Sequence, residues 1–147
     1  MSRFLPIFVG ILLSIHHIAV GAEKSGFTGS WSAQESPDFS FSLILTQVGD
    51  KITGYHIAIA HHGNRIDAVL PKEGDPSIIG TISKGIAHVR FKSGYSDATG
   101  EAQIVFKKDL LEWSIIQKSP GDCYIPQTST LYRENKIQTE QGAAANP

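Results

Sequence analysis

The property of this sequence that most constrains its fold is a two-residue alternation of apolar and polar side chains along short runs. From Phe39 to Leu45 every second residue is large and apolar, and Leu111, Trp113 and Ile115 repeat the pattern further along. Side chains of a β-strand point alternately to its two faces, so this period is typical of strands with one buried face. No helical period runs through the chain after residue 22. The pattern therefore predicts an all-β protein.

Turn residues divide the chain into eight such runs. Gly49-Asp50, Lys84-Gly85 and Lys108-Asp109 separate neighbouring runs, and a loop rich in proline and charge spans residues 71–76. The predicted strands cover residues 29–34, 39–46, 51–61, 78–83, 86–93, 101–107, 110–118 and 129–133, with 65–70 as a short continuation of the third. Closing an eight-stranded antiparallel meander into a barrel removes its two open edges. We therefore expect a closed barrel whose interior holds side chains or one small ligand.

The first residues are typical of an export signal. Arg3 gives a positive start, an apolar run extends from Phe4 to Val20, and Gly21-Ala22 supplies small residues before a cut. A membrane anchor is the weaker alternative, because His16 and His17 interrupt the run and a spanning helix needs about 20 apolar residues. We predict a signal peptide at residues 1–22, a β-barrel domain at 23–133 and a disordered tail at 134–147, in a periplasmic or secreted protein.

The charge and cysteine content limit the kinds of partner that the chain can be expected to bind. Without Arg3 the chain has 12 basic and 14 acidic side chains, a net charge of −2, and neither sign forms a run. Nucleic acid and a charged membrane surface are therefore not expected as partners. Cys123 is the single cysteine, so it has no partner for an internal disulfide. Its neighbours Tyr124 and Ile125 favour a buried, inert thiol, and a disulfide between two chains is the alternative.

Three short motifs carry a resemblance to a known group of barrels. Gly29 and Trp31 form a Gly-x-Trp in the first predicted strand, Thr53-Gly54-Tyr55 lies near the start of the third, and Trp113 lies in the seventh. The chain thereby resembles the calycin barrels, the group of lipocalins and avidins, and the resemblance implies a calycin-like barrel over nearly all of the mature chain. In lipocalins a basic residue of the last strand lies over the first-strand tryptophan. The resemblance gives that structural role to Arg133.

The activity of avidins is not implied. Biotin sites use further tryptophans and an acid in the last strand, whereas no tryptophan lies between Trp31 and Trp113 here and residues 129–133 contain no acid. The chain also resembles small secreted bacterial proteins of unassigned function, which share the segment Gly63-Asn64-Arg65-Ile66-Asp67 after the third strand. That second resemblance implies no activity.

The residues that could support catalysis do not form a recognised set. The histidines after residue 22 are His56, His61, His62 and His88. They lack the fixed Cys/His spacing of zinc sites, and no motif supports pairing any of them with Cys123. The chain also has no Gly-x-Ser-x-Gly and no glycine-rich phosphate loop, and Asp67 and Glu112 are better explained as solvated charges. We expect no enzyme activity, no catalytic residue, no cofactor and no metal; a metal-dependent enzyme that uses the histidines is the least supported class.

The segment from His61 to Asp67 contains two imidazoles, an amide, a guanidinium and a carboxylate in one short stretch. Two interpretations stay open. In the first it is a turn, with positive φ tolerated at Gly63 and Asn64 and a surface ion pair between Arg65 and Asp67. In the second it is a recognition loop at the mouth of the barrel. The candidate partner-binding residues are His61, His62, Asn64, Arg65 and Asp67.

Small size, export and the lack of a catalytic set together favour a non-enzymatic binding protein. In one version it is a periplasmic inhibitor or immunity-type protein whose loops bind another protein. In the alternative version the barrel interior binds a small apolar ligand. A continuous interior cavity favours the ligand, whereas a filled interior leaves only the outer surface to bind.

Overall fold

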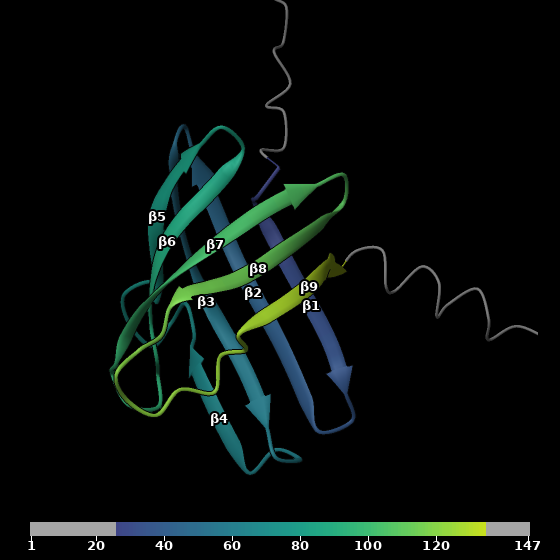
Figure 1. Ribbon diagram of the computed structural model, residues 1–147, viewed down its shortest axis with the longest axis vertical. Coiled ribbons are helices and arrows are strands. Elements are labelled where there is room, and N and C mark those ends of the chain that lie inside the picture. The colour runs from purple at the N-terminus through teal and green to yellow at the C-terminus, as the bar shows by residue number, and fades with distance from the viewer. Residues whose placement is uncertain (1–25, 135–147) are drawn as a thin grey trace, which may run out of the picture.

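The computed structural model describes residues 26–134, and this range forms nine β-strands (Figure 1). They are β1 (Gly29–Ser36), β2 (Phe39–Val48), β3 (Lys51–Ala60), β4 (Arg65–Val69), β5 (Ile78–Ser83), β6 (Ile86–Lys92), β7 (Thr99–Lys107), β8 (Leu110–Gln117) and β9 (Thr128–Arg133). Eight of them coincide with the strands expected from the alternation. β4 stands where a continuation of the third strand was expected, and it is a separate strand because the chain reverses at residues 61–64.

Eight strands form a closed antiparallel barrel. Neighbours follow the order β2-β1-β9-β8-β7-β6-β5-β3, and β2 also pairs with β3, which closes the ring. The β2–β3 ladder runs from Ser40 opposite Ile59 to Val48 opposite Lys51, so the closure is as extensive as any hairpin in the sheet. The prediction of an all-β, eight-stranded antiparallel barrel is confirmed, and its strand plan is compatible with a calycin-like fold.

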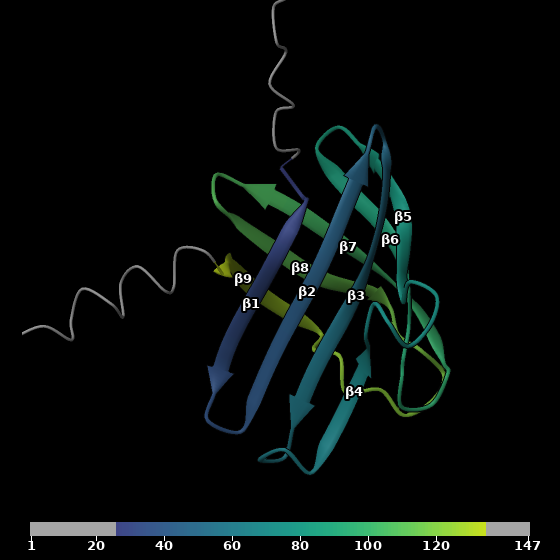
Figure 2. The same cartoon turned by 180° about the vertical axis from the view of Figure 1, so that it is seen from behind.

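β3 is shared between two neighbours on its side away from β2. Its residues 51–54 pair with β5, and its residues 56–60 pair with β4. β4 therefore lies outside the ring as a ninth strand, paired antiparallel with the second half of β3 (Figures 1 and 2). This split in the sheet brings Asp67 of β4 close to loops that belong to distant parts of the chain.

The inner face of β3 could not be chosen from apolar content, because both faces are apolar. The structure buries its even-numbered positions, among them Ile52, His56 and Ala58, and leaves Tyr55 and Ile57 half-buried. A histidine thus lies on the core side of this strand. A polar side chain in that position requires hydrogen-bond partners inside the protein.

Large side chains fill the interior of the barrel. Trp31, Trp113, Phe41 and Phe91 are each at most 1% exposed. The Trp113 ring centre lies 5.4 Å from that of Phe41 and 5.8 Å from that of Phe91, both typical separations for packed aromatic pairs. These are the largest fully buried side chains among the described residues, and they occupy interior space that a ligand would need.

One end of the barrel is closed by Trp31 and Arg133. The Arg133 guanidinium carbon lies 4.0 Å from the centre of the Trp31 ring, and its Nη1 and Nη2 donate to the carbonyls of Thr28 and Gly26 at 2.7 and 3.0 Å. Gly29 lies between them with a φ of +143°, and a Cβ there would collide with the guanidinium. This geometry explains why a glycine stands two residues before the tryptophan.

The other end of the barrel carries longer connections. The β1–β2 and β3–β4 turns lie together at this end, opposite the β2–β3, β5–β6 and β7–β8 turns (Figures 1 and 2). The loops at residues 93–98 and 118–127 join them through contacts described below. We call this region the loop end, defined by residues 37–38, 61–66, 93–98 and 118–127.

The predicted signal peptide at residues 1–22 and most of the predicted tail, from residue 135, lie outside the described residues. Between residues 26 and 134, no helix is long and apolar enough to cross a membrane.

Candidate functional site

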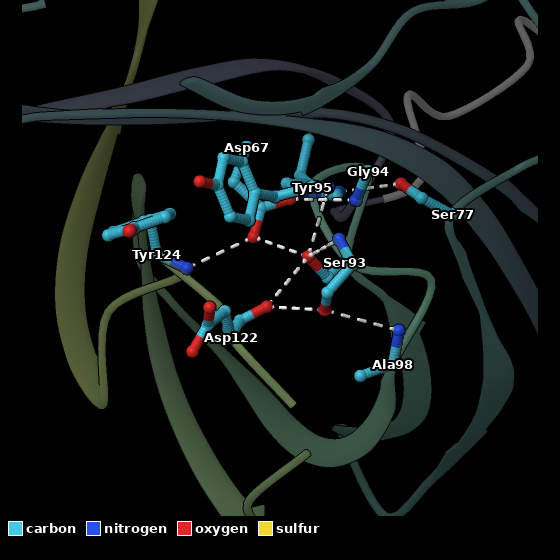
Figure 3. A network of polar contacts seen from close by, with 10 residues as sticks. Asp67, Ser77, Ser93, Gly94, Tyr95, Ala98, Asp122 and Tyr124 are labelled. Atoms are coloured by element: carbon cyan, nitrogen blue, oxygen red, sulfur yellow. Dashed lines mark hydrogen bonds and ion pairs between the residues drawn. The ribbon is translucent and has the colours of Figure 1, made fainter. Parts of the chain in front are cut away.

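A buried carboxylate, Asp67, organises the loop end (Figure 3). Its Oδ1 accepts from His56 Nε2 at 3.0 Å and from the Gly94 N–H at 2.7 Å. Its Oδ2 accepts from the Ser93 hydroxyl at 2.8 Å and from the Tyr124 N–H at 3.0 Å. The residue is 0% exposed. Four donors compensate for the loss of water around the charge, which otherwise costs several kcal/mol.

The hydrogen bonds also decide the ionisation of Asp67. Burial by itself raises the pKa of this carboxyl, but the hydrogen bonds from His56, Tyr124 and Ser93, together with the electrostatic attraction of His56, outweigh it. The result is a pKa lowered from 3.8 to about 2. Asp67 is therefore an anion at neutral pH and holds its donors as charge-assisted hydrogen bonds.

The imidazole of His56 links Asp67 to the start of β5. Its Nδ1 lies 2.7 Å from the Ser77 hydroxyl, and the ring is 1% exposed. Nε2–H donates to Asp67, and the direction of the hydrogen bond between Nδ1 and the Ser77 hydroxyl depends on the tautomer of the ring. The chain of contacts thus joins β3, β4 and the segment that enters β5.

The connected Ser77, His56 and Asp67 have the residue types of a catalytic relay. In such relays the serine hydroxyl must reach a substrate, with the imidazole as its base. Here Ser77 is 3% exposed, and the three side chains are enclosed by the elements that they connect. Their arrangement stabilises the packing of β3, β4 and β5, and Ser77 borders an open pocket of about 440 Å³ together with Ser93 and Gly94.

The same network fixes the loop that follows β6. The Ser93 hydroxyl accepts from the N–H groups of Tyr95 and Ser96 at 3.1 and 3.3 Å while donating to Asp67. The Ser96 hydroxyl donates to the carbonyl of Asp122. Gly94 packs directly on the backbone of Ala68, where a Cβ would collide with the carbonyl. The loops at 93–98 and 118–127 are therefore held against β4 and against each other.

The turn between β3 and β4 has an unusual backbone. His61 and His62 have φ values of 53° and 55°, and Gly63 follows at 88°. The Gly63 N–H donates to the Ala60 carbonyl at 3.2 Å, and the Asn64 N–H to the His61 carbonyl at 3.1 Å. Left-handed conformations cost roughly 1–2 kcal/mol in residues other than glycine, and two adjacent histidines adopt them here. The sequence led us to expect positive φ at Gly63 and Asn64; only Gly63 has it, and the histidines provide the rest of the reversal.

The histidine turn contacts two other segments of the loop end. His62 Nδ1 lies 2.6 Å from Asp38 Oδ1 in the β1–β2 connection, in an exposed pair. The His61 ring meets the Tyr124 ring edge-on at 6.0 Å and 86°, and Tyr124 meets Tyr95 at 4.9 Å and 88°. We call His61, Tyr124 and Tyr95 the ring row. Three segments far apart in the sequence thus form one continuous surface.

The five residues predicted to bind a partner divide into two groups. His61, His62, Asn64 and Arg65 are exposed at the tip of the β3–β4 hairpin, and Arg65 Nη1 donates to the Asn64 carbonyl at 3.0 Å. Asp67 is enclosed, and its partner is His56 and not Arg65. The loops that donate to Asp67 from Gly94 and Tyr124 cover it, and this removes Asp67 from any contact surface. Its contribution to such a surface is indirect.

Sequence reasoning missed the residues that surround Asp67. His56 was considered as a possible metal ligand or catalytic partner, and its burial could not be predicted because both faces of β3 are apolar. Ser77, Ser93 and Tyr124 carried no signal, because their contacts to His56 and Asp67 cross 21, 26 and 57 residues of sequence.

Cys123 borders this network: its thiol is free and half-buried, and its pKa is raised mainly by burial and in part by Asp67. It lines an open pocket of about 260 Å³ together with Phe91, Ile115 and Ile125. Within residues 26–134, no group of three or more histidine, cysteine, aspartate or glutamate side chains is arranged to hold a metal ion.

The comparisons with known proteins assign this chain to no family. No family model matches the chain, and neither the curated proteins nor the solved structures contain a match. The function must therefore be argued from the barrel and its loop end.

Proposed function

We propose that this chain is an exported, non-enzymatic protein-binding module of the inhibitor or immunity type, which binds another protein through its loop end. The export follows from the signal-like residues 1–22, which place the mature protein in the periplasm or outside the cell. The binding surface is centred on the exposed tip residues His61, His62, Asn64 and Arg65.

The observation that carries the proposal is the strained backbone at His61 and His62. Two adjacent residues hold a conformation that glycine would adopt without cost. Lys84, Asp97 and Lys108 also have positive φ, but each is a single residue; among the described residues, only His61 and His62 are adjacent non-glycine residues in this conformation. Strain of this kind persists where the surrounding structure enforces it, and it is found at functional sites. At an exposed hairpin tip, imidazole side chains contribute to the surface and not to the core, so binding is the purpose that suits them best.

The filled interior favours this role over the carriage of a small ligand. Trp31, Trp113, Phe41 and Phe91 occupy the positions that would line an interior site. The enclosed Ser77 argues in the same direction against hydrolysis. What stays available is the outer surface, and at the loop end this surface is rigidly built and chemically varied.

Affinity capture with a matched pair of arginine variants tests the proposal. The mature protein is used to capture its partner from the periplasm or medium of its own source, beside the variants Arg65→Ala and Arg90→Ala. Arg90 is an exposed arginine on β6, away from the tip. As an interface anchor, Arg65 should contribute about 2 kcal/mol, so its loss should weaken capture roughly 30-fold.

Both variants should melt within a few degrees of the unchanged protein, because exposed side chains contribute little to stability. Capture that survives Arg65→Ala, or that is lost equally in Arg90→Ala, would remove the hairpin tip from the binding surface. Recovery of one equivalent of a small molecule from the purified barrel would replace the proposal by ligand carriage.

A further inference from the structure

The ring row consists of three aromatic side chains, and this composition indicates which chemical group of a partner it can bind. It joins the turn between β3 and β4 to two loops through successive edge-to-face contacts, at 86° and 88°. A contact of this type covers one face of one ring, and the exposed fractions show how much of the row a partner can reach. Tyr95 is 45% exposed, and Tyr124 is half-buried.

The two tyrosines are fixed in place before any partner arrives. The Tyr124 N–H is bonded to Asp67, and the Tyr95 N–H is bonded to Ser93, which is itself bonded to Asp67 (Figure 3). Asp67 is thus a positioning residue for the ring row. Preorganised aromatic side chains lose little conformational entropy on binding, which is one reason why tyrosine is enriched at interfaces.

Two carboxylates belong to residues close to the ring row in sequence or through a contact. Asp122 is exposed two residues before Tyr124, and in the part of the chain that the structure describes its carboxylate forms no ion pair. Asp38 is paired with His62, the residue after His61 of the row. Aromatic faces attract cations through their negative electrostatic potential, and a nearby carboxylate strengthens this attraction.

We propose that the ring row, with Asp38 and Asp122 beside it, receives an arginine or lysine side chain of the partner protein. This inference rests on the proposed function and specifies the partner's chemistry at the same surface. Arg65, at the hairpin tip, supplies the opposite charge and suits a carboxylate of the partner. The partner surface that fits the loop end therefore carries a basic side chain a short distance from an acidic one.

Short peptides test the inference without knowledge of the partner. The probes are a peptide of alternating arginine and glycine, the same peptide with citrulline in place of arginine, and the same with glutamate. Citrulline has the shape of arginine without its charge. Binding is followed by the NMR shifts of the tyrosine ring protons during titration of the mature protein.

We expect the arginine peptide to shift the Tyr95 and Tyr124 resonances and to bind at least about fivefold more tightly than the citrulline and glutamate peptides. Tyr124→Leu should weaken that binding about fivefold, and Asp122→Asn should weaken it in the same direction. Tyr132→Leu is the matched control, because Tyr132 is 52% exposed on β9, outside the loop end. It should leave binding unchanged.

Equal binding of the arginine and citrulline peptides, no binding of either, or an equal loss in the Tyr132 variant would overturn the inference. The two proposals fail separately. If the peptides fail while capture still depends on Arg65, the protein-binding role stands and the cation-binding role of the ring row is wrong. If the arginine peptide binds as expected but partner capture does not depend on Arg65, the ring row binds a cation as inferred and the hairpin tip is not part of the protein-binding surface.

Discussion

The Arg133 guanidinium covers the Trp31 ring at 4.0 Å and at the same time donates to two carbonyls of the segment that precedes β1. This single contact closes one end of the barrel, because it ties the last strand to the entry of the first. Trp31 is 0% exposed and donates its own Nε1–H to the Phe27 carbonyl at 2.9 Å. Both ends of the described chain are thereby anchored at one place.

Truncation of the tryptophan should therefore be one of the most damaging single changes. Trp31→Ala removes the ring, leaves a cavity and releases Arg133, so we expect a loss of roughly 3–5 kcal/mol in the free energy of unfolding. Arg133→Ala should cost less, about 1–3 kcal/mol, because only the cation–π contact and two hydrogen bonds disappear. Urea denaturation of the three proteins measures both values. An unchanged midpoint for Trp31→Ala would show that this contact does not close the barrel.

The pH dependence of stability should show the ionisation of Asp67. The folded state lowers the pKa of this group from 3.8 to about 2, so the folded protein binds the proton less readily than the unfolded chain. Its contribution, about 2 kcal/mol, is present in full above about pH 4 and is lost as the pH falls through about 2. Denaturation curves between pH 5 and pH 2 measure this loss.

Two variants separate the contribution of Asp67 from that of other acids. Ser93→Ala removes one donor, so it should raise the pKa of Asp67 and shift the acid-induced loss to higher pH, at a cost of about 1–2 kcal/mol. Asp97→Asn changes an exposed carboxylate paired with Lys92 and should leave the profile in place. Identical acid profiles for all three proteins would mean that Asp67 is not held as described.

Strain at the histidine turn predicts a stabilising mutation. His61→Gly places a residue without a Cβ at a φ of 53°, so it should raise the free energy of unfolding by about 1 kcal/mol. His88→Gly is the control, because His88 is an exposed histidine within β6. Glycine in a strand should lower stability there by roughly 0.5–1 kcal/mol. A destabilised His61→Gly protein would contradict the presence of strain.

Export gives a prediction that is independent of the fold. Cleavage after Ala22 should leave Glu23, or a residue within one or two positions of it, as the N-terminus of the exported protein. Mass spectrometry of the intact exported protein measures this directly. A mass that includes Met1 would refute the signal peptide.

The barrel could be predicted from the sequence because its determinants are local. Alternation such as that from Phe39 to Leu45 assigns strands and their inner faces, and turn residues such as Gly49-Asp50 define the hairpins. β4 was only half anticipated, because the reversal before it relies on two histidines in a conformation that glycine normally supplies. The hydrogen-bond network could not be predicted. Asp67 meets Tyr124 across 57 residues, and neither residue carries a local pattern that identifies the other.

The exposed part of the candidate site followed from composition, whereas its organisation did not. Arg65 was expected in an exposed turn or loop, and it is exposed at the tip of the β3–β4 hairpin. Asp67 was grouped with it because the two are close in sequence. Arg65 and Asp67 lie on the same face of β4, because they are two residues apart. They differ in exposure because the loops at 93–98 and 118–127 cover Asp67 and leave Arg65 at the hairpin tip uncovered. The tyrosines of the ring row belong to loops, and only the folded network brings them together.

Amide hydrogen exchange on the mature protein, free and bound to its captured partner, shows directly whether the loop end binds protein. We expect slower exchange in the complex at residues 61–66, 93–98 and 118–124. We expect no change at the β2–β3, β5–β6 and β7–β8 turns, at the opposite end of the barrel. Protection confined to those turns, or to the outer face of β5 to β8, would contradict a binding role of the loop end.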